Sequence, residues 1–361
     1  MQFYYSKIAE YVIYYRLVKK ITYKSWYIYM EEKTNDMSRS NRAQGKKGKK
    51  RKRGCWRVLL VFLLIIVGIL FYVYYELRQT TDTIHSNIDD DRITHTSREN
   101  DQLDLDGDAF SILLLGIDTD DDRAGEGSTD KMQGRSDTIM VMTVNPETEK
   151  TTLVSIPRDT YTEIVGKGFQ DKINHAFAYG RAAMSMNTVQ NLLDIPIDYY
   201  VSVNMEGIQQ IVDAVGGVDI TPSMTFDQSG YSFIEGQPML MDGAQALAYS
   251  RMRYEDPQGD YGRQSRQREV VLTTLSKVAS FNSILNYQSV LNTMEDNVMT
   301  NLTFNEMVSM FLNYRSSLTN IEELQLSGYG TRMDGVYYEI IAEEDIAEVS
   351  QQLKSELNIN E

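Results

Sequence analysis

The feature that most constrains this chain is an uninterrupted apolar segment at residues 58–75. These eighteen residues carry no charge and are rich in Leu, Val and Ile, and Trp56 and several tyrosines flank them. A helix that crosses a bilayer needs roughly 20 apolar residues, and aromatic residues at its ends suit the headgroup level. The segment is therefore expected to be a transmembrane helix that divides the chain into two unlike parts.

Charge is distributed unevenly on the two sides of this segment. Residues 1–57 carry 16 Lys or Arg and four Asp or Glu, whereas residues 58–361 carry 20 and 47. Basic residues beside a membrane span stay on the cytoplasmic side. We therefore expect a single-pass protein of the cell membrane, with residues 1–57 as a cytoplasmic tail and everything after Glu76 extracellular. A cleaved signal peptide is the alternative, but the apolar core exceeds the usual roughly 7–15 residues and no A-x-A site follows it.

The single cysteine, Cys55, lies at the cytoplasmic edge of the predicted span. The external part therefore has no disulfide and needs a core large enough to be stable without one. Cys55 is either a palmitoylation site or an unmodified thiol at the membrane edge. Residues 1–36 are rich in tyrosine and show no amphipathic pattern, so Met1, Met30 and Met37 are all candidate start sites.

After the span, residues 76–108 are polar and acidic. A segment of this composition builds no core, and we interpret it as an extracellular stalk. From Ala109 onward the pattern changes to short apolar runs separated by turn-forming residues. We expect the main domain at residues 109–280, and a C-terminal part at residues 281–361 that packs on this domain or extends it.

The apolar runs of the main domain predict its secondary structure. Strands are expected at Phe110–Gly116, Thr138–Val144, Thr151–Ile156, Tyr199–Val203 and Val218–Thr221. The second and third should form a hairpin, because only a short turn-forming stretch joins them. One helix is expected to start after Asn174 as its N-cap and to run to Leu193 with a break at Gly180, and another at Met205–Val215 before Gly216-Gly217. Two more are expected, one capped by Asp242 and running through Tyr249, and one from Tyr261 to about Ser280. This alternation predicts an α/β fold, an α-β-α sandwich around a mixed central sheet.

Charged residues stand at the ends of the first three predicted strands. Asp118 follows the first, Arg135 and Asp137 precede the second, and Arg158 and Asp159 follow the third. If these strands are neighbours, all five side chains leave one edge of the sheet, where α/β proteins usually hold ligands. Asp118 and Asp137 would face each other, and a hard cation such as Mg²⁺ would offset their repulsion. Taken singly, each aspartate is better explained as a turn or capping residue, and Arg158 with Asp159 as a surface ion pair.

The second candidate feature is a cluster of arginines. The chain has no Lys or Arg from Ala182 to Ser250. Within the next eighteen residues it has five arginines, at Arg251, Arg253, Arg263, Arg266 and Arg268. Arg251 and Arg253 would point the same way in an extended segment, and Arg263 and Gln267 share one helix face with Arg266 beside them. Guanidinium groups bind phosphate oxygens two at a time, so the cluster and the strand-end residues together predict a pyrophosphate site. The alternative is a solvated helix with i,i+4 charge pairs.

No signature of a nucleophilic hydrolase competes with this interpretation. The sequence has no G-x-S-x-G motif, and its only cysteine precedes the external part. His85 and His95 fall in the predicted stalk, so only His175 remains for the main domain. This count disfavours a histidine-based triad or a zinc site.

These segments resemble the LytR-CpsA-Psr family of bacterial cell-wall proteins over about residues 109–280. The matching stretches include LLLGID (113–118), GRSDTIMV (134–141), SIPRDTY (155–161), KINHAFAYG (172–180), DGAQALAYSRMRY (242–254) and GDYGRQSRQR (259–268). The basic tail, single span and stalk are also similar to that family. The resemblance implies a membrane-anchored phosphotransferase. It would move an anionic glycopolymer, a teichoic acid or capsular polysaccharide, from undecaprenyl-pyrophosphate to peptidoglycan.

The resemblance also implies roles for individual residues. Asp118 and Asp137 match the positions that hold Mg²⁺ (or Mn²⁺). Pyrophosphate binding falls to Arg135, Arg158, Arg251, Arg253, Arg263 and Gln267. Asp260 matches a candidate general base, and Arg251 and Arg253 complete the expected catalytic group. Many relatives carry an arginine shortly after the Asp118 position. Here Arg123 comes only after three further aspartates, so it either fills that role or belongs to a solvated loop.

A lipid carrier implies a hydrophobic tunnel for its tail. Helix spacing assigns Ala183, Met186, Val189, Leu192 and Leu193 to this tunnel, and core packing explains the same residues equally well. The expected partners are the lipid-linked glycopolymer, peptidoglycan and the lipid bilayer, with no specific nucleic acid.

Two other functions stay open at this point. A membrane-bound transcriptional attenuator is one, although the short cytoplasmic tail has no helix-turn-helix pattern and its basic run would contact DNA only non-specifically. A polyprenyl-pyrophosphate hydrolase is the other, because the same residues would serve hydrolysis with water in place of the sugar hydroxyl.

Overall fold

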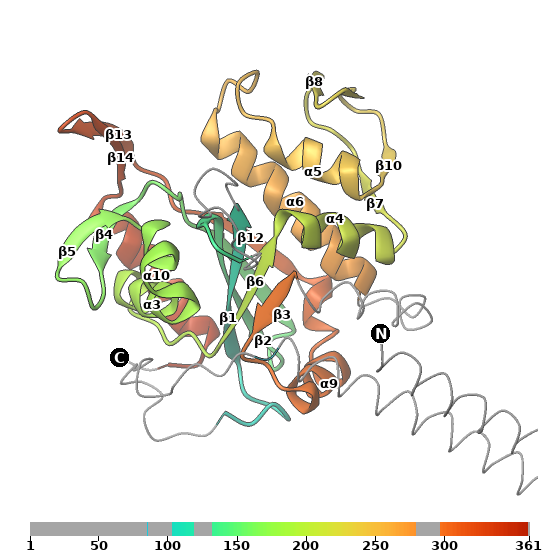
Figure 1. Cartoon of the computed structure of the whole chain (residues 1–361). Helices are drawn as coiled ribbons and strands as arrows, with labels where there is room; N and C mark the ends of the chain where they lie inside the picture. The colour runs from blue at the N-terminus through green and yellow to red at the C-terminus, as the bar shows by residue number, and fades with distance from the viewer. Residues whose placement is uncertain (1–84, 86–102, 119–131, 279–296, 360–361) are drawn as a thin grey trace, which may run out of the picture. The chain divides into compact units, whose positions relative to one another are not determined.

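A computed structural model describes residues 85, 103–118, 132–278 and 297–359 of the chain (Figure 1). The predicted cytoplasmic tail, the apolar segment 58–75, most of the predicted stalk and Arg123 lie outside these residues. No helix in the described part of the chain is long and apolar enough to cross a membrane.

A mixed six-stranded sheet forms the centre of the described structure, in the order β11-β6-β1-β2-β3-β12. Its strands are β1 (Phe110–Asp118), β2 (Arg135–Asn145), β3 (Lys150–Ser155), β6 (Tyr199–Asn204), β11 (Val298–Thr300) and β12 (Ile321–Gln325). β2 is antiparallel to both β1 and β3, which confirms the predicted hairpin, whereas β6 runs parallel to β1 and β12 parallel to β3. Two strands of this sheet therefore come from the C-terminal part of the chain.

Six α-helices are described: α3 (His175–Leu193), α4 (Met205–Ala214), α5 (Gly243–Arg251), α6 (Asp260–Val278), α9 (Phe304–Asn313) and α10 (Glu343–Glu356). Successive side chains of β1 point to opposite faces of the sheet. Leu113, Leu115 and Ile117 pack into one buried cluster with residues of α3 and α10, whereas Phe110 and Ile112 lie in another, against which α6 and α9 pack. Helices therefore cover both faces of the sheet (Figure 1).

The predicted start and break of α3 are confirmed. Asn174 is its N-cap residue, and the helix is interrupted at Gly180 (φ −154°) and Arg181 (φ 58°). The Asn174 side chain makes no capping hydrogen bond, so its amide is available for another contact. A third buried cluster lies under α5 and includes Phe226, Phe233 and Tyr249.

The helix α5, at the end of the stretch without Lys or Arg, is longer than predicted. Asp242 caps α5 in a reciprocal capping box with Gln245, as expected from its sequence position, but the helix continues to Arg251. The expectation of an extended segment from Arg251 to Arg253 is therefore wrong in part. Only Met252, with extended backbone angles (φ −59°, ψ 135°), separates the two arginines.

Several short elements were not predicted from the sequence. They are β4 (Tyr161–Ile164), β5 (Phe169–Lys172), β8 (Phe226–Gln228), β9 (Tyr231–Phe233), β10 (Met239–Met241), β13 (Tyr329–Met333), β14 (Val336–Ile340) and a 3₁₀ turn at Ser317–Thr319. β10 pairs with the predicted strand β7 (Val218–Ile220). The β13–β14 hairpin matters for the site, because the backbone N–H of Glu339 donates to the carbonyl of Asp159 at 2.9 Å, just after β3.

Candidate functional site

The ends of β1, β2 and β3 meet at one edge of the sheet. Asp118, the last residue of β1, lies directly opposite Arg135, the first residue of β2. β3 ends at Ser155, and Arg158 and Asp159 follow it. The pairing of the strands therefore brings all five predicted strand-end residues to the same edge.

Asp137 owes its position to a β-bulge. Gly116 of β1 pairs with Thr138 and the next residue, Ile117, pairs with Ser136, so Asp137 has no partner on β1. A bulge of this kind redirects a side chain and is common beside functional sites. The residue opposite Asp118 is consequently Arg135, and the expected face-to-face arrangement of Asp118 and Asp137 across the two strands is not found.

The Asp137 carboxylate is held by two donors. The Arg158 guanidinium donates to one oxygen, and the Asn174 amide lies 3.5 Å from the other. Asn174 thereby links the start of α3 to the strand edge. Its sequence position predicts Asn174 only as a helix cap, and nothing in the local sequence indicates this second contact.

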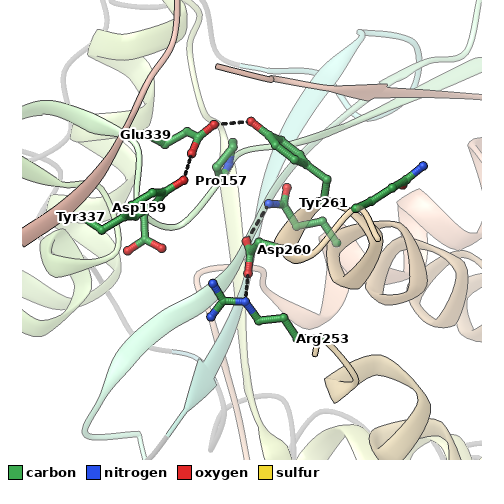
Figure 2. Close-up of a pocket in the computed structure, with 9 residues that line it drawn as sticks. Pro157, Asp159, Arg253, Asp260, Tyr261, Tyr337 and Glu339 are labelled. Atoms are coloured by element: carbon green, nitrogen blue, oxygen red, sulfur yellow. Dashed lines mark hydrogen bonds and ion pairs between the residues drawn. The ribbon is translucent and has the colours of Figure 1, made fainter. Parts of the chain in front are cut away.

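The N-terminus of α6 brings a second charged group to the site. Asp260, the first residue of α6, has its Oδ1 atom 2.7 Å from Arg263 Nη2 and 3.7 Å from Arg253 Nε. The Gln264 amide donates to its other oxygen at 3.0 Å. Figure 2 shows the Arg253 guanidinium directed at this carboxylate. One hydrogen-bond donor, on Oδ2, and two nearby guanidiniums therefore surround the candidate general base, while its Oδ1 accepts no hydrogen bond from the described residues.

The strand edge and the helical group form one site. Arg251 Nη2, at the end of α5, lies 3.4 Å from Asp118 Oδ1 on β1. Burial lowers the pKa of the Arg263 guanidinium, Asp260 opposes this effect, and the positive charge of Arg158 adds to it. Burial also acts to lower the pKa of Arg158, but Asp137, Asp159 and Asp260 outweigh it and raise that pKa. Both guanidiniums remain cationic at neutral pH.

Several buried polar atoms in this site have no hydrogen-bond partner among the described residues. They are Nε of Arg158, Nε and Nη2 of Arg263, Oδ1 of Asp260, Oε1 of Gln267 and Oδ1 of Asn174. Arg263 Nη2 is close to Asp260, but its N–H does not point at the carboxylate well enough for a hydrogen bond. A buried donor or acceptor without a partner costs about 1–3 kcal/mol. Unused guanidinium donors of this kind are suited to receive the oxygens of an anion.

The two remaining arginines of the sequence cluster lie elsewhere. Arg266, expected beside Arg263 and Gln267, instead contacts Asp256 at 2.5 Å and donates to the Met252 carbonyl at 2.6 Å. Arg268 donates to the Ser155 hydroxyl at 3.0 Å and pairs with Glu323 at 3.1 Å. These contacts attach α6 to the residues before it and to the central sheet. The five-arginine cluster therefore divides into three site residues and two structural ones.

The residues assigned to a lipid tunnel line α3 on its covered side. Met186, Val189 and Leu193 are at most 1% exposed and belong to the hydrophobic core, and Leu192 packs against that core. Ala183 is half-buried. This burial is in line with the core-packing alternative, and contact with a lipid tail stays a prediction.

The metal prediction rests on the chemistry of Asp118 and Asp137. The residues that the structure describes contain no group of three or more His, Cys, Asp or Glu side chains arranged to hold a metal ion. Two carboxylates at one sheet edge nevertheless fit Mg²⁺, which takes one or two carboxylates and completes its coordination with water and substrate phosphates.

A cavity of about 180 Å³ adjoins Asp260. Figure 2 shows the residues that line it. Its wall includes Asp159, Arg253, Asp260, Tyr261, Tyr337 and Glu339. Tyr261 lies inside a stretch that the sequence analysis quoted, yet it received no role there. Tyr337 and Glu339 carried no signal, because they lie more than 70 residues further along the chain.

Residues 71–355 match the LytR_cpsA_psr family. A teichoic acid transferase of Enterococcus faecalis, named polyisoprenyl-teichoic acid–peptidoglycan teichoic acid transferase TagU, is 45% identical over 86% of this chain and 99% of that protein. A crystal structure from the same organism, named as a transcriptional regulator, has a TM-score of 0.64 at 41% identity and covers 72% of this chain and 92% of its own. A structure described as TagT bound to LIIa-WTA has a TM-score of 0.64 at 31% identity and covers 76% and 100%. The chain belongs to the LytR-CpsA-Psr family, as its motifs indicated.

Proposed function

We propose that this LytR-CpsA-Psr protein transfers a teichoic acid polymer from a polyisoprenyl-pyrophosphate carrier to peptidoglycan. The relatives named as TagU supply the reaction class. The observation that carries the proposal is the group of buried guanidinium atoms of Arg158 and Arg263 that lack partners beside the Asp118–Arg251 and Asp137–Arg158 contacts. Because these guanidinium nitrogens have no partner in the described residues, a diphosphate could bind to them without displacing the ion pairs already present.

In this proposal the pyrophosphate lies between the strand edge and the two helices. Arg158, Arg263 and Gln267 bind it from the buried side, while Arg135, Arg251 and Arg253 approach from the more exposed side. Asp118 and Asp137 would hold Mg²⁺, which would neutralise charge on the phosphate oxygens. Phosphoryl transfer needs mainly positioning and electrostatic stabilisation from the protein, and these residues provide both.

The transfer step requires an acceptor hydroxyl next to Asp260. The hydroxyl oxygen forms a bond to the phosphorus on the glycopolymer side, and the bond from that phosphorus to the bridging oxygen breaks. The carrier leaves as polyisoprenyl phosphate, and the hydroxyl proton passes to Asp260. Because phosphate oxygens compete for Arg253 and Arg263, donor binding would loosen their hold on the Asp260 carboxylate.

The apolar segment 58–75 supports a location at the outer surface of the cell membrane, where the lipid carrier is embedded. No nucleotide is needed there, because the carrier pyrophosphate itself supplies the driving force. The anchor would keep the site within reach of both the carrier and the wall.

The proposal is tested with the full chain, a lipid-pyrophosphate glycan, peptidoglycan oligomers and Mg²⁺. We expect a covalent conjugate between glycan and peptidoglycan, joined through one phosphate. Release of free glycan phosphate without a conjugate would overturn the transferase in favour of a hydrolase.

A regulatory function is tested separately, because one similar structure is named as a transcriptional regulator. Deleting residues 1–45 while keeping the span should leave the wall polymer content and gene expression unchanged. Altered gene expression with unchanged wall polymer would make regulation the primary function.

A further inference from the structure

The cavity beside Asp260 differs in charge from the diphosphate site next to it. Three of its wall residues are carboxylates, at Asp159, Asp260 and Glu339, and Arg253 is the one cation among the wall residues described. Lys172 pairs with Asp159 and Arg263 with Asp260, each at 2.7 Å, but Glu339 has no such cation among the ion pairs described, so phosphate oxygens would meet like charge on that side. The cavity therefore suits a neutral ligand with many hydroxyl groups, because hydroxyls donate hydrogen bonds to carboxylate oxygens.

We propose that this cavity binds the acceptor sugar, a neutral pyranose of the glycan whose hydroxyl is phosphorylated. This inference rests on the proposed function. Asp260 lies in the wall of the cavity and also contacts Arg253 and Arg263 of the diphosphate site. A sugar in the cavity thus presents a hydroxyl between its proton acceptor and the phosphorus that it attacks, with the bond changes given above.

The far wall of the cavity is rigidly built around Glu339. This carboxylate is 5% exposed and accepts hydrogen bonds from the hydroxyls of Tyr261 and, at 2.6 Å, Tyr337. The backbone N–H of Gly328 donates to the Tyr261 hydroxyl at 2.8 Å. Burial and the bond to Glu339 raise the pKa of Tyr261 to about 12, so its hydroxyl stays protonated at neutral pH.

The cavity also has the size and the apolar surface that a sugar ring requires. Its volume of about 180 Å³ is more than ten times the roughly 15 Å³ that one water molecule needs. The Tyr337 side chain is 40% exposed, so part of its ring is open for stacking against the apolar face of a sugar. The amide of Gln264, which already donates to Asp260, lies in the same wall.

In this arrangement the β13–β14 hairpin contributes to binding of the acceptor sugar. The hairpin supplies Tyr337 and Glu339, and its backbone is tied to Asp159 by the 2.9 Å hydrogen bond after β3. The diphosphate site is built from the preceding residues of the chain, whereas the acceptor side of the cavity comes from the C-terminal part. Donor and acceptor recognition are therefore separable by mutation.

The test compares Tyr337→Ala with Tyr329→Ala in the full chain. Tyr329 is 64% exposed on the same hairpin and does not line the cavity, so it is a matched control. In the conjugate-forming assay we expect Tyr337→Ala to raise KM for peptidoglycan oligomers about tenfold, because a ring contact is lost. The KM for the lipid-linked donor should stay within twofold of wild type, and Tyr329→Ala should change neither constant.

A second variant, Glu339→Gln, keeps the shape of the side chain and removes its charge. We expect it to raise the KM for peptidoglycan oligomers as well, again with the donor KM unchanged. An unchanged acceptor KM in both variants, or a raised donor KM in Tyr337→Ala, would overturn the inference.

Failure of the proposed function is recognised separately, because wild-type protein would then form no conjugate. In that case, calorimetric titration of the full chain with peptidoglycan oligomers measures acceptor binding directly. Binding that Tyr337→Ala weakens and Tyr329→Ala does not would support the cavity assignment. Absence of binding, or equal binding by all three proteins, would contradict it.

Discussion

Two arginines in the first half of α6, Arg263 and Arg266, have different environments. Arg263 is buried beside Asp260 with two nitrogen atoms that lack a hydrogen-bond partner in the described part of the chain. Arg266, less than one turn later, contacts Asp256 and the Met252 carbonyl through its two Nη atoms and stacks over Phe226 at 5.5 Å, and only its Nε lacks a partner in the described part of the chain. Both are less than 10% exposed, so burial alone does not distinguish them.

The two arginines differ in their outer nitrogens: both Nη atoms of Arg266 have acceptors, whereas Nη2 of Arg263 has no hydrogen-bond partner among the described residues and is the atom we expect to bind a ligand. A guanidinium has five N–H donors. Arg266 and Arg268 use their Nη atoms to fix α6 to its neighbours. Arg263, by contrast, leaves both Nε and Nη2 without an acceptor among the described residues. Substitutions should therefore divide into those that reduce stability and those that reduce turnover.

The largest effect is expected from Arg266→Ala. The variant leaves the buried Asp256 carboxylate and the Met252 carbonyl without their donor. Breaking a buried ion pair in this way costs about 3–5 kcal/mol of unfolding free energy. Denaturant unfolding of wild type and variant measures the loss. The double variant Arg266→Met, Asp256→Leu should recover much of it, and equal stability of the single variant and wild type would contradict the structural role.

Arg251→Ala and Arg253→Ala test the other side of the comparison. Both side chains are at least 40% exposed and contact only Asp118 and Asp260, respectively, among the ion pairs described. Loss of one charge-stabilising donor at a transferring group costs on the order of 10²–10³ in turnover, about 2.7–4 kcal/mol. The rate of conjugate formation should fall by this factor, while the melting temperature stays unchanged. Wild-type turnover in both variants would remove these arginines from the site.

Gly134→Ala should lower both the stability of the fold and the turnover, each to an intermediate degree. A Cβ atom at this position would lie 2.2 Å from the carbonyl oxygen of Asp118. The end of β1 would have to move, which costs about 1–3 kcal/mol and displaces the Asp118 carboxylate. Unfolding and turnover are measured together. Gly107→Ala, where a Cβ meets no atom within 4 Å, is the control and should change neither.

The smallest effect is expected from Lys277→Ala, near the C-terminal end of α6. Lys277 pairs with Asp219 at 2.5 Å, but the aspartate side chain is 67% exposed. Pairs of this kind contribute about 0–1 kcal/mol. Thermal unfolding at low and high salt should show a difference from wild type that shrinks as salt rises. If Lys277→Ala lost as much unfolding free energy as Arg266→Ala, the distinction between buried and exposed ion pairs would be wrong.

Local pattern was sufficient for the elements that carry strong periodic or capping signals. The apolar runs predicted β1, β2 and β3, and Asn174 with Gly180 predicted the start and the break of α3. The capping residue Asp242 likewise marked the start of α5. These signals are local because apolar alternation, a cap and a glycine each act within a few residues. The short hairpins β4–β5 and β13–β14 were missed, since neither has a long apolar run.

Local sequence patterns did not predict the contacts that distant segments make in the site. The bulge that leaves Asp137 without a strand partner depends on the register of β1 against β2, which no residue of β2 specifies alone. Arg266 and Arg263 look alike in sequence and differ only in what packs around them. Glu339 meets Tyr261 across 78 positions of the chain.

By itself, the sequence determined the class of fold and the family and predicted the residue types of a pyrophosphate site, because periodicity, capping and motif spacing are written along the chain. Only the tertiary structure decided which arginines keep free donors, where Asp137 points, and that a carboxylate-lined cavity adjoins Asp260. The physical reason is that a side chain's hydrogen-bonding partners come from whatever segments the fold packs against it, and those segments are remote in sequence.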